Sequence, residues 1–426
     1  MRGQLFLSEL RIHLRQRSLW LGLPAMAVFG FVLTNGLRVD QDLSIASHFH
    51  LFNLQVVLLM MTLPFVISVL GMTAFLRDSS HRFIELSYSV PVSSRAFLLS
   101  RFTGLVATAS LVILAAQLGT AVGIGVSSMQ PVPAVQLGGY LLWNFVVVVL
   151  PAILLYSASY LLLGTITRNA LALHFAMLVL FIIYMLIATK SGSPVIVSPG
   201  LPNPVLVRLM LWFDPFAMAP VAAQAAELSI AARNSVFVAL DRALLLNRLG
   251  VLLLAIVILT LALRRFTLRL PTRKKGGKER QQAESIVRPA TIYAASNTHS
   301  GWLAQWHAFL SLCRIEYLAT LKSHLFLLII AGWALVIGGE VFPALTWLEP
   351  MAQRVPGTAD ALNRFQWDIV PQFGMLILLL VSSDIAWRDR HLGISSLVAP
   401  TPAGNVVLLA SKWLTLVLLV ATLLLV

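Results

Sequence analysis

Side chains that could catalyse a reaction or bind a metal are few and scattered in this sequence. It has one cysteine and nine histidines, and none of them shows the spacing of a metal site. The basic stretch KKGGKER (274–280) does not match a phosphate-binding loop, because Glu279 follows its last lysine and no strand is expected before it. The patterns GxSxG and HExxH are also missing. The sequence therefore predicts no catalytic, cofactor or metal site in these residues, and no enzyme.

A second kind of chemistry, proton or ion transfer, would need titratable groups deep in a membrane. His174, Glu340 and Asp384 are the candidates, but each falls near the end of an apolar stretch, so we interpret them as interfacial residues. Polar side chains within one apolar stretch could line a transport path through the membrane, although such groups more often form hydrogen bonds to neighbouring helices. They are Asn144, Tyr156, Ser157, Ser159 and Tyr160.

One polar pattern occurs twice, in the first coupling segment (76–101) and the second coupling segment (387–412). The two align without a gap at an offset of 311, and an Arg-Asp pair and a proline stay in register. Each copy could form a short helix that a soluble partner grips, with Ser93 or Ser94 capping the next helix. The alternative is a solvated loop whose arginines only follow the positive-inside tendency. The residues assigned to the partner contact are Arg77, Asp78, Arg82, Phe83, Glu85, Leu86, Pro91, Arg388, Asp389, Leu397 and Pro402.

The elements around these segments are predicted to be membrane-spanning helices. The 426 residues are 58% hydrophobic and 11% charged, where a soluble protein has about a quarter charged. Uncharged runs reach the length of about 20 residues that a helix needs to cross a bilayer. We therefore expect an all-α polytopic membrane protein, in which Arg248 reaches the interface by snorkelling. The predicted spans are 18–37, 43–76, two within 102–167, 169–189, 244–263, 325–342, 365–385 and a ninth from 413.

The net charge of +14 is explained by membrane topology, and we expect no nucleic-acid partner. Residues 264–288 hold nine Lys or Arg and two Glu, which favours a cytoplasmic location. Counting spans from there places the N-terminus and both coupling segments inside, and the acidic loop 340–368 outside. The last apolar run, 413–426, is too short to cross a bilayer, so we expect a fragment of a longer protein.

The register of the spans predicts two units in parallel orientation. ELRIHLRQ precedes the first span and EYLATLKS precedes the seventh at nearly the same offset, so the repeat axis is expected along the membrane normal. A first six-helix unit (1–265) would carry an interfacial helix (3–17), the first coupling segment and an outer segment (190–242). A basic cytoplasmic linker (266–307) would lead to an incomplete second unit (308–426), which contains the second coupling segment.

The stretches FLSELRIHLRQRSLWL and FLRDSSHRFIELSYSVPVSSRAFLLSRF resemble the membrane subunit of ABC-2 type transporters. The resemblance implies a permease, an exporter in the bacterial inner membrane, whose coupling helices dock on two copies of a cytoplasmic ABC ATPase subunit. That partner would bind the ATP. A doubled permease of this kind also resembles membrane halves fused to an M1-type aminopeptidase. Two alternatives stay open: an ion-coupled secondary transporter, and a membrane anchor for a fused C-terminal peptidase domain.

Overall fold

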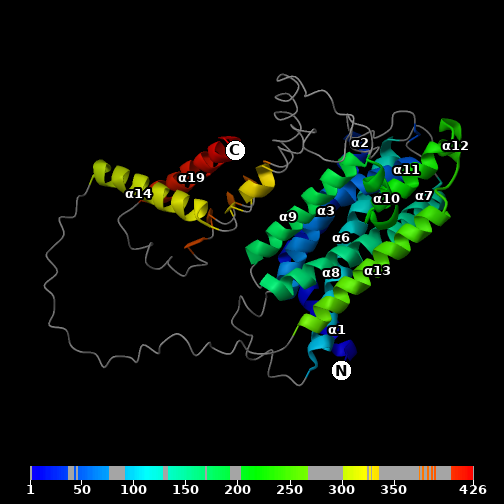
Figure 1. Cartoon of the computed structure of the whole chain (residues 1–426), viewed down its shortest axis with the longest axis horizontal. Helices are drawn as coiled ribbons and strands as arrows, with labels where there is room; N and C mark the ends of the chain where they lie inside the picture. Colours follow the sequence, from blue (N-terminus) through cyan, green and yellow to red (C-terminus); the bar gives the residue numbers. More distant parts are fainter. Residues whose placement is uncertain are drawn as a thin grey trace. The chain divides into compact units, whose positions relative to one another are not determined.

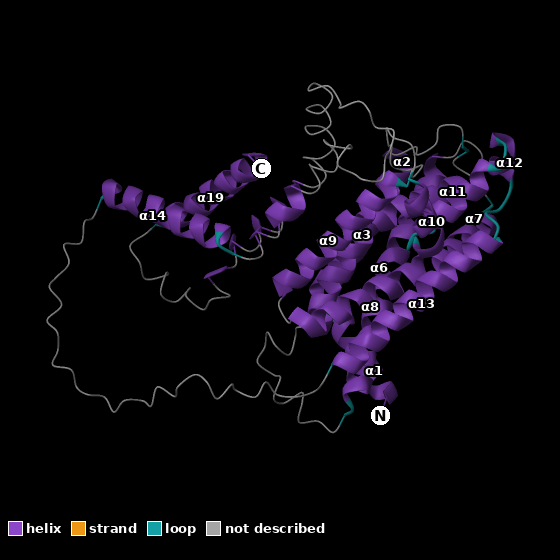
Figure 2. Cartoon of the chain, viewed as in Figure 1, coloured by secondary structure: helices purple, strands orange, loops and turns teal. Residues whose placement is uncertain are grey.

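The computed structural model divides into two compact units, a first unit (Met1–Leu268) and a second unit (Arg269–Val426), each considered by itself (Figure 1). All regular structure in the described residues is helical (Figure 2). The described residues are 2–36, 43–44, 47–75, 92–127, 133–167, 170–191, 203–266, 301–323, 326–327, 329–334, 374, 377–378, 381–382, 385–386, 388–389 and 404–425.

Six helices in this described part are long and apolar enough to cross a membrane, as the composition predicts. A further helix, α9 (Ala170–Lys190), occupies the predicted fifth span and is apolar over Ala172–Ala188. The predicted spans 325–342 and 365–385 lie largely outside the described residues. The six are α2 (Arg17–Gly36), α3 (His48–Phe75), α6 (Ser94–Ser127), the run α7–η1–α8 (Ala134–Thr167), α13 (Arg242–Arg265) and α19 (Asn405–Leu425).

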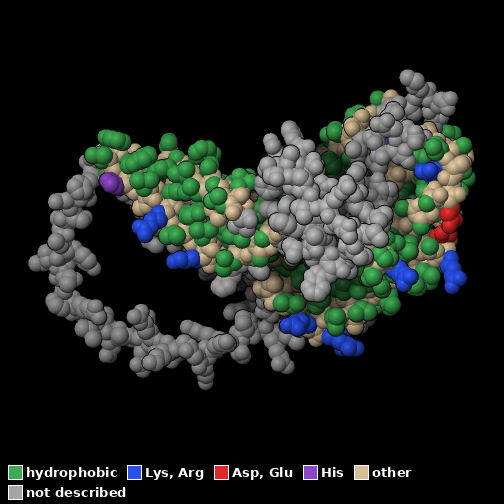
Figure 3. All heavy atoms as spheres, turned by 45° about the horizontal axis from the view of Figure 1, so that its top comes forward, with side chains coloured by type: hydrophobic (Ala, Val, Ile, Leu, Met, Phe, Trp, Pro, Cys, Tyr) green, Lys and Arg blue, Asp and Glu red, His purple; other side chains and the backbone are tan. Residues whose placement is uncertain are grey.

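Helix α3 forms the centre of the first unit. Of its span, 72% is buried, against 17% for α2 and 28% for α13. It contacts α6, α8 and α9, and Figure 1 shows these helices running side by side. The outer helices expose large apolar side chains, among them Trp20 of α2 and Leu253 of α13. Apolar side chains cover much of the visible surface in Figure 3, which is the surface a lipid-embedded bundle requires.

Helices α2 and α6 pack with their backbones in contact. A Cβ atom added to Gly30 would lie 2.1 Å from the Ala116 carbonyl oxygen, and one added to Gly119 would lie 1.8 Å from that of Ala27. A side chain at either position would overlap the facing backbone, so only glycine allows this approach. Small residues serve the same purpose at many helix contacts in membranes.

One span contains a short stretch of wider π-helical turn. It is built from α7 (Ala134–Trp143), η1 (Asn144–Val149) and α8 (Leu150–Thr167). Pro151 follows the π-helical stretch and cannot donate a hydrogen bond to the carbonyl four residues earlier. The N–H of Leu150 bonds the carbonyl of Phe145 five residues earlier, and the helix continues into α8.

The predicted outer segment (190–242) contains a sharply bent helix pair. Asn203 caps the first helix by accepting from the N–H groups of the second and third residues that follow it. The helix direction bends by 111° between them, and Ala217 at the break has a positive φ of 61°. The pair therefore either enters and leaves the membrane on one side or forms a broken span. The helices of this region are α10 (Pro204–Phe213), α11 (Met218–Ala226) and α12 (Ile230–Ser235).

In the second unit, α14 (Trp302–Leu321) packs against α19. Side-chain contacts join the two helices at two levels: Cys313 Sγ and Thr415 Oγ1 lie 3.6 Å apart, and Tyr317 Oη and Thr422 Oγ1 lie 2.8 Å apart. Helix α1 (Arg2–Leu14) packs against α6 in the first unit. In both units, therefore, the helix before the first span lies against the helix that follows the coupling segment.

The length predicted for the ninth span was wrong. Helix α19 begins at Asn405 and not at residue 413, so it has 21 residues. At 1.5 Å per residue it is about 31 Å long, enough to cross the hydrocarbon core. Polar side chains such as Ser411 and Lys412 hid this start because they interrupt the apolar run.

Candidate functional site

Most residues of the predicted partner contact lie outside the described part of the chain. Two ranges that the structure does not describe, 76–91 and 390–403, contain nine of these residues, so their assignments stay predictions. They are Arg77, Asp78, Arg82, Phe83, Glu85, Leu86 and Pro91 in the first range, and Leu397 and Pro402 in the second. Arg388 and Asp389 are described, as are the residues that follow each coupling segment.

The end of the first coupling segment is the start of a membrane helix. Ser93 accepts a hydrogen bond from the Ala96 N–H at 3.3 Å through its side chain, and its carbonyl accepts from Phe97 N at 3.0 Å. This is the capping predicted for Ser93, and it satisfies one of the open amides at the helix start. Residues 94–101 therefore form the first two turns of α6, rigidly joined to the span behind them.

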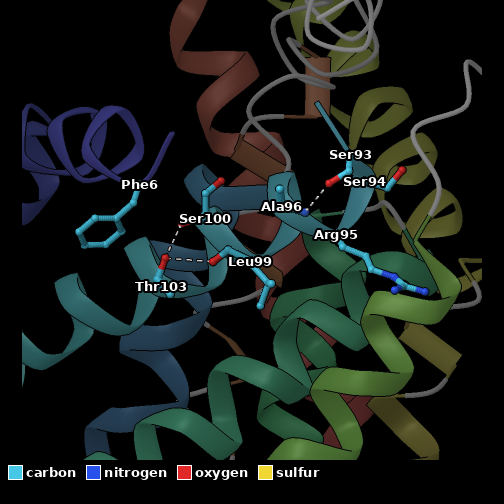
Figure 4. Close-up of a pocket in the computed structure, with 8 residues that line it drawn as sticks. All are labelled: Phe6, Ser93, Ser94, Arg95, Ala96, Leu99, Ser100 and Thr103. Carbon is cyan, nitrogen blue, oxygen red and sulfur yellow. Dashed lines mark hydrogen bonds between the residues drawn. The ribbon is translucent and has the colours of Figure 1, made fainter. Parts of the chain in front are cut away.

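A cavity of about 940 Å³ opens beside these turns (Figure 4). The aromatic ring of Phe6 comes from α1, and the other lining residues come from the start of α6. Thr103 Oγ1 bonds the carbonyls of Leu99 and Ser100, so its hydroxyl is held by its own helix. No acid or histidine is among the lining residues that the structure describes. The lining residues are Phe6, Ser93, Ser94, Arg95, Ala96, Leu99, Ser100 and Thr103.

Helix α1 is tied to α6 by a buried ion pair next to this cavity. Arg101 Nε lies 3.8 Å from Glu9 Oε1, and the two side chains are 3% and 9% exposed. The guanidinium also lies 4.2 Å above the ring of Phe97, which stacks in turn on Phe266 after the end of α13. The start of α6, the end of α13 and helix α1 therefore meet at one end of the first unit.

The second unit places four charged residues at the corresponding position. Arg388 Nη1 donates to Glu316 Oε2 of α14 at 2.9 Å. Its neighbour Asp389 accepts from Lys412 Nζ of α19 at 2.7 Å. Lys412 Nζ also donates to the carbonyl of Ile385 at 3.0 Å. We call Glu316, Arg388, Asp389 and Lys412 the ion-pair cluster; it joins the start of the second coupling segment to both neighbouring helices.

A second polar group was missed by sequence reasoning, at the break between α10 and α11. Arg248 was expected to snorkel, but this was wrong: it is only 5% exposed and donates to the carbonyls of Asp214 and Pro215. The Asp214 carboxylate accepts from the N–H groups of Phe216 and Ala219, both at 2.9 Å. The sequence offered two signals: Arg248 lies inside one apolar stretch, and Asp214 and Pro215 follow a different apolar stretch. Nothing in the sequence indicates that these residues contact each other.

Other polar groups in the bundle are held by hydrogen bonds or buried. His174 of α9 bonds Ser68 of α3, which joins two helices. Ser159 bonds its own helix at Leu155, so it does not make the interhelical bond that was the favoured interpretation. Asn144, Tyr156, Ser157 and Tyr160 are all buried. Within the described residues the hydroxyls of Ser157 and Tyr160 have no hydrogen-bond partner, so the interhelical bonds expected of them are not formed. Within the described residues no three His, Cys, Asp or Glu side chains are placed to hold a metal ion.

These features define a polytopic α-helical membrane protein with polar contacts concentrated at the two ends of its first helix bundle. The sequence matches no known family model and no curated protein.

Proposed function

We propose that this protein is the permease component of an ATP-driven transporter of the ABC-2 type, acting as an exporter. The supporting observation is a recurring contact: in each unit, charged side chains connect the helix before the first span to the helix after the coupling segment. Glu9 and Arg101 do so in the first unit, and the ion-pair cluster does so in the second. In this proposal the chain has no enzyme activity of its own, and a separate cytoplasmic ATPase subunit supplies the ATP hydrolysis.

The continuity of α6 supports its role as a lever. It runs without interruption over 34 residues from Ser94, a length of about 50 Å at 1.5 Å per residue. Because its first two turns belong to the first coupling segment, a force applied to the segment acts directly on the span. The close backbone contact at Gly119 makes α2 follow the same movement.

The cavity beside Ser93 supports docking at this end of the bundle. It combines apolar floor residues, Phe6 and Leu99, with the exposed guanidinium of Arg95. Such a mixed concave surface suits a protein partner better than catalysis, since it offers contact area without an activated nucleophile. We infer that the ATPase covers this cavity together with the coupling segment.

The charge distribution supports a cytoplasmic location for this end, in the bacterial inner membrane. Arg264 and Arg265 end α13 close to the start of α6, where Phe97 and Phe266 stack. Arg11 of α1 is also exposed near this end. Clustered positive charge marks the inner ends of spans, so the N-terminus is proposed to lie inside.

The two units are proposed to be parallel repeats. Helix α14 packs on α19 as α1 packs on α6, and at the sequence offset Lys412 corresponds to Arg101. A parallel repeat places both coupling segments on one side of the membrane, where two ATPase copies can close against each other.

The proposal is tested by co-expressing the full chain with candidate ABC ATPase subunits and purifying the complex into nanodiscs. Arg95→Glu should abolish co-purification and ATPase stimulation, because it reverses the exposed charge at the cavity. Arg208→Glu is the matched control: this arginine is also exposed, but it lies in α10 near the opposite end of the bundle. Equal association of both variants and the wild type would refute docking at this cavity.

A further inference from the structure

We propose that Glu316 and Lys412 are positioning residues, which hold the start of the second coupling segment between α14 and α19 through Arg388 and Asp389. The role of these residues in transmitting force rests on the proposed function. The ion pairs themselves do not depend on that function. If the proposal is correct, displacement of the segment moves α14 and α19 together.

Two adjacent residues of opposite charge make this arrangement possible. Successive residues of a helix point about 100° apart, so Arg388 and Asp389 can reach different neighbours. Arg388 reaches Glu316 at 2.9 Å, and Asp389 reaches Lys412 at 2.7 Å. Each short distance is that of a charge-assisted hydrogen bond. The pair of residues therefore bridges two helices that are nearly a hundred residues apart in the sequence.

The cluster is electrically balanced and partly shielded from solvent. It holds two acids and two bases, and its side chains are between 12% and 26% exposed. Neutralising one member leaves its partner charged and half-buried, which costs more than an exposed pair contributes. Lys412 adds a bond to the Ile385 carbonyl, so it also holds the helix that leads into the segment. The balance explains why a charged cluster can sit against apolar helices.

The first unit contains counterparts of Glu316 and Lys412, the two members of the ion-pair cluster that lie on α14 and α19. Glu9 of α1 and Arg101 of α6 form a direct ion pair of 3.8 Å. Arg101 aligns with Lys412 at the offset of 311, whereas Glu9 lies one helical turn after Leu5, the residue that aligns with Glu316. In each unit an acid before the first span and a base after the coupling segment belong to ion pairs, with each other in the first unit and through Arg388 and Asp389 in the second. This recurrence is the independent observation that favours a mechanical role over chance pairing at a helix end.

The single cysteine provides a reporter for the cluster. Cys313 lies one helical turn before Glu316 and is 5% exposed, and it faces Thr415, one turn after Lys412. Opening of the cluster separates the helices at this level and exposes the thiol. Because the chain has one cysteine, maleimide labelling reports on this position without further engineering.

The first experiment measures Cys313 labelling in the full chain in nanodiscs. Glu316→Gln and Asp389→Asn should each raise the labelling rate by about tenfold, because local opening becomes easier when a half-buried partner is lost. The double variant Glu316→Arg with Arg388→Glu should return the rate to near wild type. Lys322→Gln is the control, since this exposed lysine follows the end of α14. Unchanged rates in both single variants, or a swap that labels as fast as they do, would overturn the proposal.

A second experiment separates this inference from the proposed function. In the complex with the ATPase, a non-hydrolysable ATP analogue should change Cys313 labelling in the wild type. The same analogue should change it less in Glu316→Gln, while ATPase binding persists, because Glu316 is not among the residues assigned to the partner contact. A full nucleotide response in that variant would refute the positioning role. If no ATPase binds the wild type at all, the proposed function fails, and the labelling of the isolated protein still decides the role of the cluster.

Discussion

Arg248 Nη1 donates a hydrogen bond to the main-chain carbonyl of Pro215 at 3.1 Å, at the break between α10 and α11. The same guanidinium bonds the carbonyl of Asp214 and the side chain of Asn247. Asn247 in turn donates to the carbonyls of Met210 and Leu211, both at 3.0 Å. One turn of α13 thus donates to the carbonyls at the end of α10 and at the break, two of which, those of Met210 and Asp214, also accept from the main-chain N–H groups of Asp214 and Ala217.

This relationship predicts a large loss of stability for Arg248→Met. The change keeps most of the side-chain volume but removes every donor, so the carbonyls of Asp214 and Pro215 lose these hydrogen bonds and the buried Asp214 carboxylate loses a nearby positive charge. We expect a cost of about 3–5 kcal/mol in unfolding free energy. The measurement is thermal or denaturant unfolding of the purified protein in detergent. Arg242→Met, at the exposed start of the same helix, should change stability by less than about 0.5 kcal/mol. Similar losses in both variants would contradict the assigned bonds.

The hydrogen bonds of the Asp214 carboxylate predict that two substitutions at the same break destabilise the protein to different degrees. Asp214→Asn keeps one acceptor oxygen for the Phe216 or Ala219 amide, whereas Asp214→Ala keeps none. We expect the alanine variant to lose about 1–3 kcal/mol and the asparagine variant less. Unfolding curves of the two variants give the comparison. An asparagine variant less stable than the alanine variant would show that these two amide bonds do not hold the break.

The contact of α2 with α6 predicts opposite effects for two glycines of one helix. Gly119→Ala places a Cβ atom against the Ala27 carbonyl and should destabilise the bundle by at least about 1–3 kcal/mol. Gly125→Ala meets no atom within 4 Å, so it should be neutral or stabilise by up to about 1 kcal/mol. Melting temperatures of the two single variants are sufficient for the test, and a stable Gly119→Ala protein would rule out the backbone contact.

The cap at Ser93 predicts a local effect at the start of α6. Ser93→Ala removes the acceptor for the Ala96 amide and should cost about 1 kcal/mol. Hydrogen–deuterium exchange should rise in the peptide that covers the first turn of α6 and stay unchanged near Ser127. Ser93→Asp should preserve protection, because aspartate caps as well as serine does. Equal exchange in all three proteins would mean that the cap does not hold this turn.

The buried ion pair of the first unit predicts non-additive stability. Glu9→Gln leaves Arg101 charged and buried, and we expect a cost of about 3–5 kcal/mol. The double variant Glu9→Gln with Arg101→Gln should recover part of this loss, because it removes the charge of both side chains. A double-mutant cycle from equilibrium unfolding measures the coupling. Additive effects of the two single changes would show that the side chains do not interact.

Several parts of this protein could be predicted from local sequence. The spans of α2, α3, α6 and α13 follow from uncharged runs, because crossing a bilayer depends on length and apolar character alone. The division of 102–167 into two spans and the cap at Ser93 follow from proline and serine at helix boundaries. These features require only a few consecutive residues, and the structure confirms them.

The partners of the polar residues depended on the tertiary structure. A sequence shows that Arg248 is a charge in an apolar stretch, but whether it reaches water or a buried carbonyl depends on where α10 ends in space. The start of α19 at Asn405 was missed for the same reason: Lys412 is tolerated within the helix because Asp389 neutralises it. The partner contact assigned to residues 77–91, the larger part of the contact in the first unit, remains a prediction.

The sequence by itself thus determined that the chain is a helical membrane protein and where most of its spans lie, since hydrophobicity and length are properties of each segment alone. Only the tertiary structure decided which charges pair, as Glu316 does with Arg388 across 72 residues. Pairing requires two helices to approach within hydrogen-bond distance, and that approach is set by the packing of the whole bundle.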